Sequence, residues 1–245
     1  MKCIVLAAGY ATRLYPLTEN FPKPLLDVGG RPILNWLLDD LEDTGLIDEY
    51  ILVSNHRFVQ HFSEWKTSLK YADKVTVIDD GSTDNDNRLG AVRDIAFAIE
   101  QCNIDDDTMV IAGDNILDFS LNEFIKFFYS KQATCVMRYY ESSVEKLRRT
   151  GVATVDDNER VISMIEKPQN PASHWAVPPF YIYLRSDLVK VMDGIKDPSC
   201  NVDAPGSFIA WLCGKCDVYS YIMPGKRHDI GNLESLEEAR KFFAC

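Results

Sequence analysis

The stretch that decides the fold is Leu6-Ala-Ala-Gly-Tyr-Ala-Thr-Arg-Leu-Tyr-Pro-Leu-Thr-Glu-Asn-Phe-Pro-Lys-Pro-Leu26, which follows the apolar residues Ile4 and Val5. The apolar residues predict a buried strand that ends in a small-residue turn, and such turns let backbone N–H groups approach a phosphate. The turn lacks the Gly-x-Gly-x-x-Gly of dinucleotide-binding folds, and no Gly-Lys-Ser/Thr follows it as in a Walker loop. Arg13 and Lys23 come next, and two cations beyond the carboxyl end of a strand suit a clamp on a polyphosphate.

The alternative for this stretch is a structural turn with solvated cations. Prolines at positions 16, 22 and 24 argue against that alternative, because they stiffen the segment and fix the direction of Lys23. We therefore interpret the stretch as a phosphate-binding turn. The residues assigned to nucleotide binding in it are Leu6, Ala7, Ala8 and Gly9.

The composition is that of an ordinary globular protein, with 245 residues of which 46% are hydrophobic and 26% charged. A net charge of −11 argues against a nucleic-acid or anionic-membrane partner, because either would need a basic surface. The apolar stretches are too short to span a membrane, and the first one predicts a strand rather than a signal peptide. Seven scattered cysteines are expected to be reduced. We expect a soluble, cytoplasmic protein, with a homo-oligomer left open.

Short β-branched runs alternate with amphipathic stretches, a pattern typical of βαβ units. We expect an α/β fold with an open, mixed but mostly parallel, Rossmann-like sheet flanked by helices. The second half favours mixed or antiparallel strands, and the chain is expected to form one domain with two lobes. Strands are expected at residues 2–7, 50–54, 75–79, 108–112, 134–139, 152–155, 161–166, 180–184 and 218–223, and helices at 32–44, 59–70, 91–102 and 233–243.

Three further segments place charged residues near the expected end of a strand or the start of a helix. Asp114 follows the strand expected at 108–112, where a carboxylate at the edge of an open sheet suits Mg²⁺ together with substrate phosphates. Glu166 and Lys167 end another strand, and Asp229 precedes the last helix. Asp114 and Asp229 are expected to meet, because the ends of parallel strands share one sheet edge. Singly, each segment also fits a solvated pair or a turn.

Together, in this order and spacing, the segments resemble the sugar-1-phosphate nucleotidylyltransferases, also called nucleotide-sugar pyrophosphorylases. The opening of that family, with Thr-Arg-Leu, Pro-Leu-Thr and Pro-Lys-Pro-Leu, matches residues 9–26, and the resemblance extends over most of the chain. It implies a fold of the nucleotidyltransferase type in a single domain over residues 1–245. Within it, the resemblance implies a nucleotide-binding lobe at about 1–113 and a sugar-phosphate lobe at about 114–245.

The resemblance also implies roles for individual residues. Arg13 and Lys23 match the triphosphate-binding cations of the family, and Asp114 and Asp229 match its two metal-ligating aspartates. Gly90 matches a glycine at a helix start beside the base. Near the sugar, Glu166 and Lys167 match sugar and sugar-phosphate contacts, with Lys167 also assigned a catalytic role, and Gly151 and Tyr181 match residues that line the same pocket.

The implied reaction joins a nucleoside triphosphate, dTTP or UTP, to a sugar 1-phosphate and releases pyrophosphate, with Mg²⁺ as cofactor. A phosphate oxygen of the sugar attacks the α-phosphorus in line. This oxygen is already anionic near neutral pH, so no general base is needed. The barrier lies in bringing two anions together, which cations and positioning must overcome. The candidate residues are accordingly aspartate, lysine and arginine.

The sequence departs from the family at several places. Ala8 and Ala11 replace loop glycines, and no glutamine precedes Gly90 to read the base, which leaves the base open. Residues 176–181 and 201–206 replace family segments beside the sugar, which leaves the sugar open. Two alternatives remain: a non-catalytic regulator of the same fold that senses nucleotide-sugars, and a cytidylyltransferase acting on a non-sugar phosphate such as phosphocholine. The matched cations and aspartates argue against the first alternative, and the matched sugar contacts argue against the second.

Overall fold

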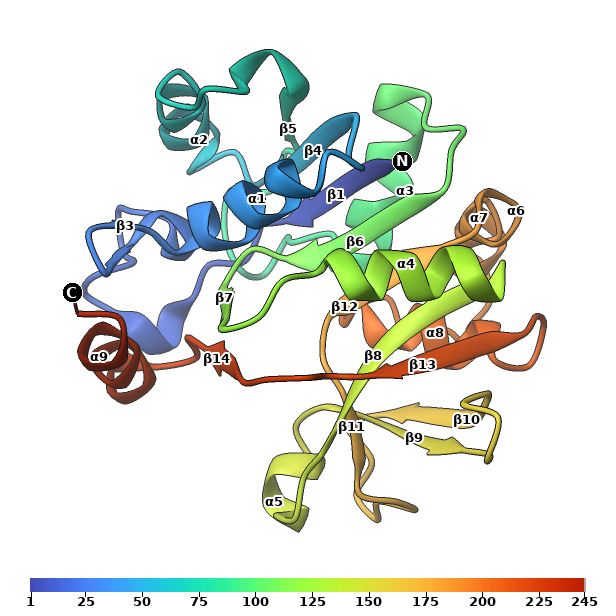
Figure 1. Cartoon of the computed structure of the whole chain (residues 1–245). Helices are drawn as coiled ribbons and strands as arrows, with labels where there is room; N and C mark the ends of the chain where they lie inside the picture. Colours follow the sequence, from blue (N-terminus) through green and yellow to red (C-terminus); the bar gives the residue numbers. More distant parts are fainter. Residues whose placement is uncertain (245) are drawn as a thin grey trace. The chain divides into compact units, whose positions relative to one another are not determined.

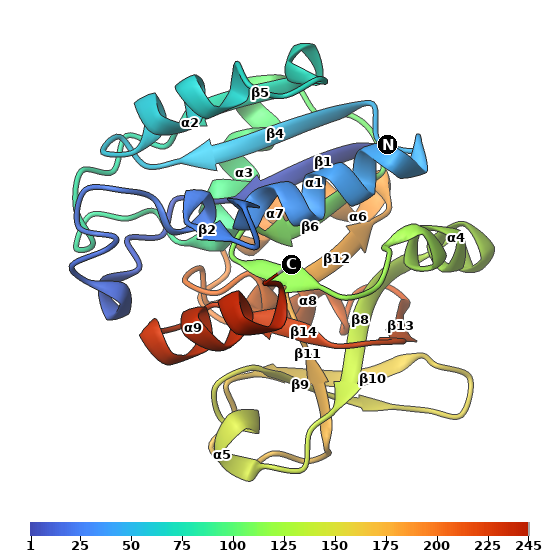
Figure 2. The ribbon, with the colours of Figure 1, turned by 60° about the vertical axis from the view of Figure 1, so that its left-hand side comes forward.

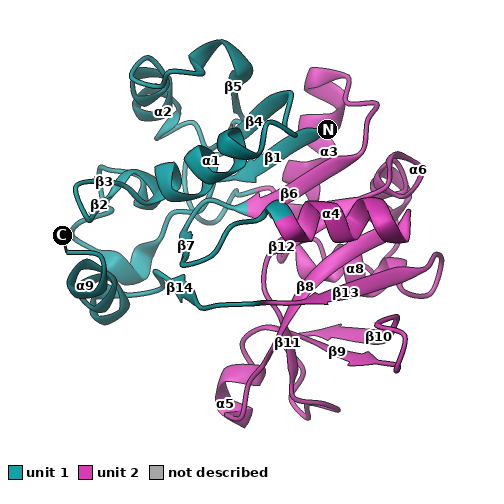
Figure 3. Ribbon diagram, in the orientation of Figure 1, with its two compact units in different colours: residues 1–88, 112–122, 224–245 teal, residues 89–111, 123–223 magenta. Residues whose placement is uncertain are grey.

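The computed structural model describes residues 1–244 and divides the chain into two compact units (Figure 3). Unit 1 comprises Met1–Arg88, Ala112–Asn122 and Pro224–Cys245, and unit 2 comprises Leu89–Ile111 and Glu123–Met223. Each unit is assembled from segments that are separate in the sequence. Residues that meet within a unit therefore come from distant parts of the chain.

Unit 1 is built on three parallel strands, β1 (Lys2–Leu6), β4 (Glu49–Ser54) and β5 (Val75–Asp79). β4 lies in the middle, pairs with both neighbours and is buried from Tyr50 to its end, as expected for a parallel strand covered on both faces. Parallel neighbours need crossover connections, and two helices supply them. These are α1 (Ile33–Thr44), in front of the β1–β4 pair in Figure 1, and α2 (Val59–Lys66), which packs beside β5 in Figure 2.

Helix α1 forms where the sequence predicts it. Its buried residues Ile33, Leu34, Leu37, Leu38 and Leu41 recur at helical spacing and form one apolar face. The helix ends at Gly45, whose φ of 66° is left-handed and suits glycine. This helix packs against β7 (Asn115–Leu117) and against η2 (Lys23–Leu25), two elements that carry or adjoin candidate site residues.

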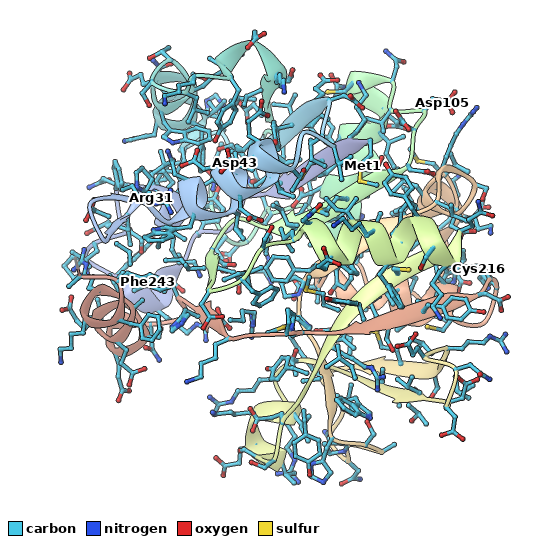
Figure 4. All side chains as sticks on the ribbon, in the orientation of Figure 1. Met1, Arg31, Asp43, Asp105, Cys216 and Phe243 are labelled. Atoms are coloured by element: carbon cyan, nitrogen blue, oxygen red, sulfur yellow. The ribbon has the colours of Figure 1, made fainter. Side chains whose placement is uncertain are left out.

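An apolar cluster of unit 1 forms around two short antiparallel pairs of strands. β7 pairs with β14 (Arg227–Asp229), and β2 (Asp27–Val28) pairs with β3 (Arg31–Pro32). Helix α9 (Leu233–Phe242) packs on β14 and β2. Figure 4 labels Arg31 and Phe243, which both contact Trp36, at 3.6 Å and 4.6 Å from its ring centre. The buried members of the cluster are Leu14, Leu26, Val28, Ile33, Ile116, Ile230, Leu236 and Ala239.

Unit 2 contains a mixed sheet organised around β8 (Thr134–Tyr140), which pairs with β13 in parallel and with β11 and β12 in antiparallel. β12 continues to β6, and β11 continues through β9 to β10, all antiparallel. A bridge between Arg160 and Tyr219 brings the start of β10 to β13. The bounds are β6 (Thr108–Ala112), β9 (Gly151–Val155), β10 (Val161–Glu166), β11 (Trp175–Val177), β12 (Phe180–Tyr183) and β13 (Val218–Ile222).

The helices of unit 2 are mostly short. α3 packs on α7, α7 packs on α8, and α8 packs on β10. The bounds are α3 (Ala91–Cys102), α4 (Asn122–Lys131), α5 (Val144–Leu147), α6 (Arg185–Leu188), α7 (Val191–Gly194) and α8 (Gly206–Leu212); the remaining short helices, η1 (Thr12–Leu14) and η3 (Ala72–Lys74), belong to unit 1.

The α/β class and the mixed second half predicted from the sequence are confirmed, and β5, β6, β10 and α3 have the predicted bounds. The helix expected at 59–70 ends at Lys66, because the amides of Thr67, Ser68 and Leu69 bond three residues back in successive turns. Six cysteines are free thiols, and Cys245 lies outside the described residues. Among residues 1–244, no helix has both the length and the apolar character needed to cross a membrane.

Candidate active site

The turn after β1 is fixed by hydrogen bonds to Gly113 and to two residues at or just after the end of β4. Gly113 N–H donates to the Leu6 carbonyl at 3.1 Å, and Ala7 N–H donates to the Val53 carbonyl at 3.0 Å. The Asn55 side chain donates to the Ala8 carbonyl at 2.9 Å. Gly9 lies exposed beyond these bonds, and a Cβ at its position would meet no atom within 4 Å. The open end of the turn is therefore at Gly9, where a phosphate can approach the backbone.

The two predicted cations after the turn, Arg13 and Lys23, differ in how far they are exposed to solvent. Ala11 adopts a left-handed φ of 48°, and its carbonyl accepts a bond from Thr18 Oγ1 at 2.8 Å. Helix η1 then buries Leu14 and leaves Arg13 exposed. Lys23 behaves differently, because its side chain is only 11% exposed. The prolines on either side of Lys23 hold it at the start of η2.

Lys23 and Asp114 form an ion pair. The Lys23 Nζ lies 2.5 Å from Asp114 Oδ2 and also donates to the Ile230 carbonyl at 2.7 Å. The other carboxylate oxygen of Asp114 accepts a bond from Asn115 Nδ2 at 2.8 Å. Burial acts to raise the pKa of Asp114, but the adjacent Lys23 ammonium and the charge of Arg227 outweigh it and hold that pKa below its usual range. Asp114 is thus kept ionised, and two predicted site residues are brought together.

The pairing of β14 with β7 places Asp229 beside the residue that follows Asp114. Asp229 lies opposite Asn115 in the register, and Ile230 N–H donates to the Asp114 carbonyl at 3.3 Å. The sequence predicts that Asp114 and Asp229 meet at the edge of a parallel sheet. In the structure, a short antiparallel ribbon brings their backbones together instead.

Arg227 lies in the candidate site and was not among the residues predicted from the sequence. Its guanidinium donates to Asn115 Oδ1 at 2.8 Å and lies 3.4 Å from Asp229 Oδ2. From β14 it therefore links Asp229 to Asn115, the residue that follows Asp114. The signal available in the sequence was its spacing of two residues from Asp229, which puts both side chains on one face if the segment is a strand.

The donor set at this place suits a hard divalent cation. Mg²⁺ commonly takes one or two protein carboxylates and completes its shell with water and substrate phosphates. Asp114 and Asp229 supply two carboxylates, one half-buried and one exposed. Within residues 1–244, no cluster of three or more histidine, cysteine, aspartate or glutamate side chains is arranged to hold a metal without a substrate. The two aspartates thus fit a metal that arrives with phosphates.

The predicted sugar contacts lie in unit 2, where Glu166 is enclosed by two glycines. A Cβ at Gly151 would lie 3.0 Å from Glu166 Oε2, and a Cβ at Gly206 would lie 2.1 Å from the same oxygen. The carboxylate therefore occupies space that side chains at these positions would fill. Burial raises the pKa of Glu166, although the Lys167 ammonium opposes the shift. Gly206 ends the 201–206 segment, where the sequence departs from the resembled family beside the sugar.

Lys167 follows Glu166 with an unusual backbone. Its φ of 50° is left-handed, a conformation that is rare for lysine and is concentrated at functional sites. The Lys167 N–H donates to the Thr150 carbonyl at 3.0 Å, which fixes the strand end. The exposed side chain lines a cavity of about 360 Å³, together with Arg148 and the Pro168–Asn170 segment. Two cations and open space make this cavity suitable for an anion.

Gly90 and Tyr181 hold other positions in unit 2. Gly90 has a φ of 90°, and the amides of the next two residues donate to the carbonyls of Asp203 and Val202 at 3.1 and 3.0 Å. The start of α3 is therefore tied to the segment before Gly206. Tyr181 is 2% exposed in β12, opposite Val136 of β8. Gly90, Gly151, Glu166, Lys167 and Tyr181 all belong to unit 2, whereas Leu6–Gly9, Arg13, Lys23, Asp114 and Asp229 all belong to unit 1.

The amino-acid sequence matches one protein-family model and is similar to several known proteins. Residues 2–244 match the family model described as nucleotidyl transferase. A UTP–glucose-1-phosphate uridylyltransferase of Haloferax volcanii is 30% identical over 187 residues, which cover 75% of this chain and 72% of that protein. The bifunctional protein GlmU of Methanocaldococcus jannaschii is 31% identical over 177 residues, which cover 71% of this chain but only 38% of GlmU. The chain thus spans well under half of that relative.

Solved structures resemble this one in fold. UDP-glucose pyrophosphorylase in complex with UDP-glucose superposes with a TM-score of 0.82 at 20% identity, and 99% of this chain and 97% of that chain are covered. The apo form of a UDP-glucose pyrophosphorylase gives a TM-score of 0.83 at 18% identity, covering 99% and 98%. These likenesses show a shared fold over the whole length of the chain.

Proposed function

The chain belongs to the nucleotidyl transferase family, and we propose that it transfers a nucleotidyl group from a nucleoside triphosphate to a sugar 1-phosphate and releases pyrophosphate. The observation that carries the proposal is the Lys23–Asp114 pair, which lies beside the β1 turn and the Asp229 strand in one unit. The Haloferax relative is named for UTP and glucose 1-phosphate, and the UDP-glucose complex has the same fold. We therefore propose UTP or dTTP as the nucleotide.

In the proposed mechanism, a phosphate oxygen of the sugar 1-phosphate attacks the α-phosphorus in line and pyrophosphate departs. The attacking oxygen is already an anion, so the protein's task is to hold two anions together. Gly9 lies at the open end of the turn, where its backbone can meet the triphosphate. Arg13 and Lys23 then supply positive charge beside it. Gly90 is proposed to lie beside the base.

We assign Asp114 and Asp229 as ligands of Mg²⁺. When bound, the ion neutralises charge on the phosphates that these carboxylates would otherwise repel. Lys23 holds the Asp114 carboxylate through Nζ, and Arg227 holds Asp229 and Asn115. These contacts orient both carboxylates before any ligand arrives, and the Lys23 ammonium also keeps the pKa of Asp114 low.

On the acceptor side, Lys167 is proposed to bind the sugar phosphate and Glu166 to accept hydrogen bonds from sugar hydroxyls. The cavity at Lys167 and the glycine-enclosed carboxylate of Glu166 support these roles. Gly151 and Tyr181 are proposed to line the same sugar site. The two functional lobes and the cytoplasmic location remain predictions from the sequence.

A matrix of substrates tests the proposal. Pyrophosphate release is measured for each nucleoside triphosphate against a set of sugar 1-phosphates and phosphocholine, with Mg²⁺ and with EDTA. Metal-dependent release with a sugar 1-phosphate is the expected result. Release only with CTP and phosphocholine indicates the cytidylyltransferase alternative. Binding of nucleotide-sugar without turnover of any pair indicates the regulator.

A further inference from the structure

A buried arginine in unit 2 is not used by the proposed mechanism. Arg138 in β8 is 7% exposed, and no carboxylate among residues 1–244 forms an ion pair with it. Its Nε is buried without a hydrogen-bond partner. Glu159 acts on it only electrostatically and is itself paired with Lys131 at 2.9 Å. Because an unpaired buried charge is costly, an apolar residue here would be more stable unless the cation has a ligand.

The Arg138 side chain is held rather than loose. Its guanidinium carbon lies 4.2 Å from the centre of the Trp175 ring, a cation–π contact across β8 and β11. Stacking on an aromatic face leaves the edge of a guanidinium, with its N–H donors, for another partner. Oxyanions are the partners that this donor edge matches best, since two N–H groups can contact two oxygens.

The strand register places Arg138 on the face of the predicted sugar contacts. In β11, Trp175 lies opposite Tyr140 of β8, and Val177 lies opposite Gly151 of β9. Continuing this antiparallel register by two residues from Tyr140 places Arg138 opposite Val177. Residues directly opposite on neighbouring strands share a face, so Arg138 and Gly151 share one, two strands or roughly 10 Å apart.

The same face also carries Tyr181 and Glu166. Tyr181 lies opposite Val136, which is two residues from Arg138 on β8 and so points to the same side. Glu166 lies opposite Gly151 in the β9–β10 register. This face therefore presents one carboxylate near Gly151 and one unpaired guanidinium on β8. A neutral sugar would engage the first group and leave the second without a partner.

Building on the proposed function, we propose that Arg138 determines specificity by binding an oxyanion substituent of the sugar, so that the preferred acceptor is an acidic sugar 1-phosphate. A carboxylate on the sugar ring is the substituent whose size and geometry suit a single guanidinium edge. Lys167 would bind the phosphate that reacts, and Arg138 would bind the second negative group.

Three substrates test the proposal on the wild-type protein. Glucose 1-phosphate, glucuronic acid 1-phosphate and glucose 1,6-bisphosphate differ only at C6, and kcat/KM is measured for each by pyrophosphate release. We expect a roughly ten- to hundredfold preference for an anionic substrate, the size of one charge-assisted hydrogen-bonded contact. A preference for the uronate over the bisphosphate identifies the carboxylate. Equal or faster use of glucose 1-phosphate overturns the proposal. If no sugar 1-phosphate reacts, the proposed function itself fails.

A variant series then assigns the preference to Arg138. Arg138→Gln should reduce the ratio of anionic to neutral kcat/KM to about one, and Arg138→Lys should retain part of it. Arg160→Gln is the matched control, because Arg160 lies in the adjacent hairpin, is exposed and pairs with Asp217 at 2.7 Å. That control should leave the ratio unchanged. An unaltered ratio in a folded Arg138→Gln variant overturns the assignment, and if this variant does not fold, the wild-type ratio decides.

Discussion

At the scale of single residues, the candidate site is organised by ion pairs between neighbouring charged side chains. Lys23 illustrates this, because it is nearly buried and serves two partners, the Asp114 carboxylate and the Ile230 carbonyl. Its third N–H remains for a ligand, since an ammonium has three donors. The lysine therefore orients a carboxylate and keeps one donor, which under the proposed function binds a phosphate.

Replacing Lys23 with alanine should lower turnover by about 10²–10³, corresponding to about 2–4 kcal/mol of lost transition-state stabilisation. Lys74→Ala is the matched control, because Lys74 also pairs with a carboxylate, Glu42, at 2.5 Å in unit 1. The control should keep its activity. Steady-state kinetics of both variants, with thermal melting to confirm folding, make the comparison. Wild-type turnover in Lys23→Ala would remove this residue from the phosphate site.

Glu166 should make stability depend on pH. Burial raises its pKa in the folded protein, so the native state holds the proton more tightly than the unfolded chain does. The resulting stabilisation is fully present below the unfolded-state pKa, about 4.3, and is lost as pH rises through the folded-state pKa. Because Glu166→Gln has no such ionisation, it should gain stability relative to wild type as pH rises.

Urea unfolding of wild type and Glu166→Gln at pH 4 and pH 8 measures this difference. Glu145→Gln, a change at an exposed glutamate of unit 2, serves as the control. The free energy of unfolding of Glu166→Gln minus that of wild type should be larger at pH 8 than at pH 4. Equal pH trends for the two variants would show that the Glu166 carboxylate is not destabilised by burial.

Elements of the fold differ in how far the sequence specifies them. Strands such as β5 and β6 are short runs rich in β-branched residues between polar turns, so pattern alone predicts their bounds. The pair β7 and β14 has three residues in each strand, too few for a periodic signal, and its pairing joins residues 115–117 to the distant residues 227–229. For this reason the sequence could predict that the Asp114 and Asp229 segments lie together, but not the ribbon that joins them. The spacing of Arg227 from Asp229 becomes informative only once this segment is known to be a strand.

Helix α4 is a different case, because Phe124, Ile125 and Phe128 do carry a helical pattern that the sequence analysis overlooked. The contact of Gly206 with Glu166 was beyond sequence reasoning. It depends on two backbones that come together through tertiary packing alone, and a glycine in the sequence gives no indication of what fills the space beside it.

The start of helix α3 should be unusually sensitive to substitution. Gly90 has φ 90° and ψ 147°, in a region that is essentially restricted to glycine, and a Cβ there would lie 2.6 Å from the Val202 carbonyl oxygen. We expect Gly90→Ala to lower the free energy of unfolding by about 2–5 kcal/mol, combining backbone strain with displacement of the 202–203 segment.

Gly81→Ala is the control for backbone strain alone. Gly81 has a φ of 79°, but a Cβ at its position would meet no atom within 4 Å. Its loss should be about 1–2 kcal/mol, measured by urea unfolding alongside Gly90→Ala. If both substitutions destabilise the protein equally, the close approach to Val202 contributes nothing.

At the scale of the whole molecule, ligand binding should raise the free energy of unfolding. A nucleoside triphosphate at 100 times its Kd adds about 2.7 kcal/mol, which for a chain of this length raises Tm by about 5–10 °C. Adding UTP with Mg²⁺ but without sugar 1-phosphate measures binding in the absence of turnover. We expect the rise in Tm to depend on Mg²⁺ in the wild type and to lose that dependence in Asp229→Asn. The same Mg²⁺ dependence in both proteins would exclude Asp229 as a metal ligand.

The assembly of unit 1 from three separate segments also has a consequence for biosynthesis. A nascent chain that has grown as far as Met223 already contains every residue of unit 2, together with Lys23 and Asp114. It still lacks β14, and with it Asp229 and the Ile230 carbonyl that Lys23 contacts. The ribosome therefore delivers β14 and Ile230, the last partners of the charged cluster, only after all of unit 2 has been synthesised, so this cluster is completed later than unit 2.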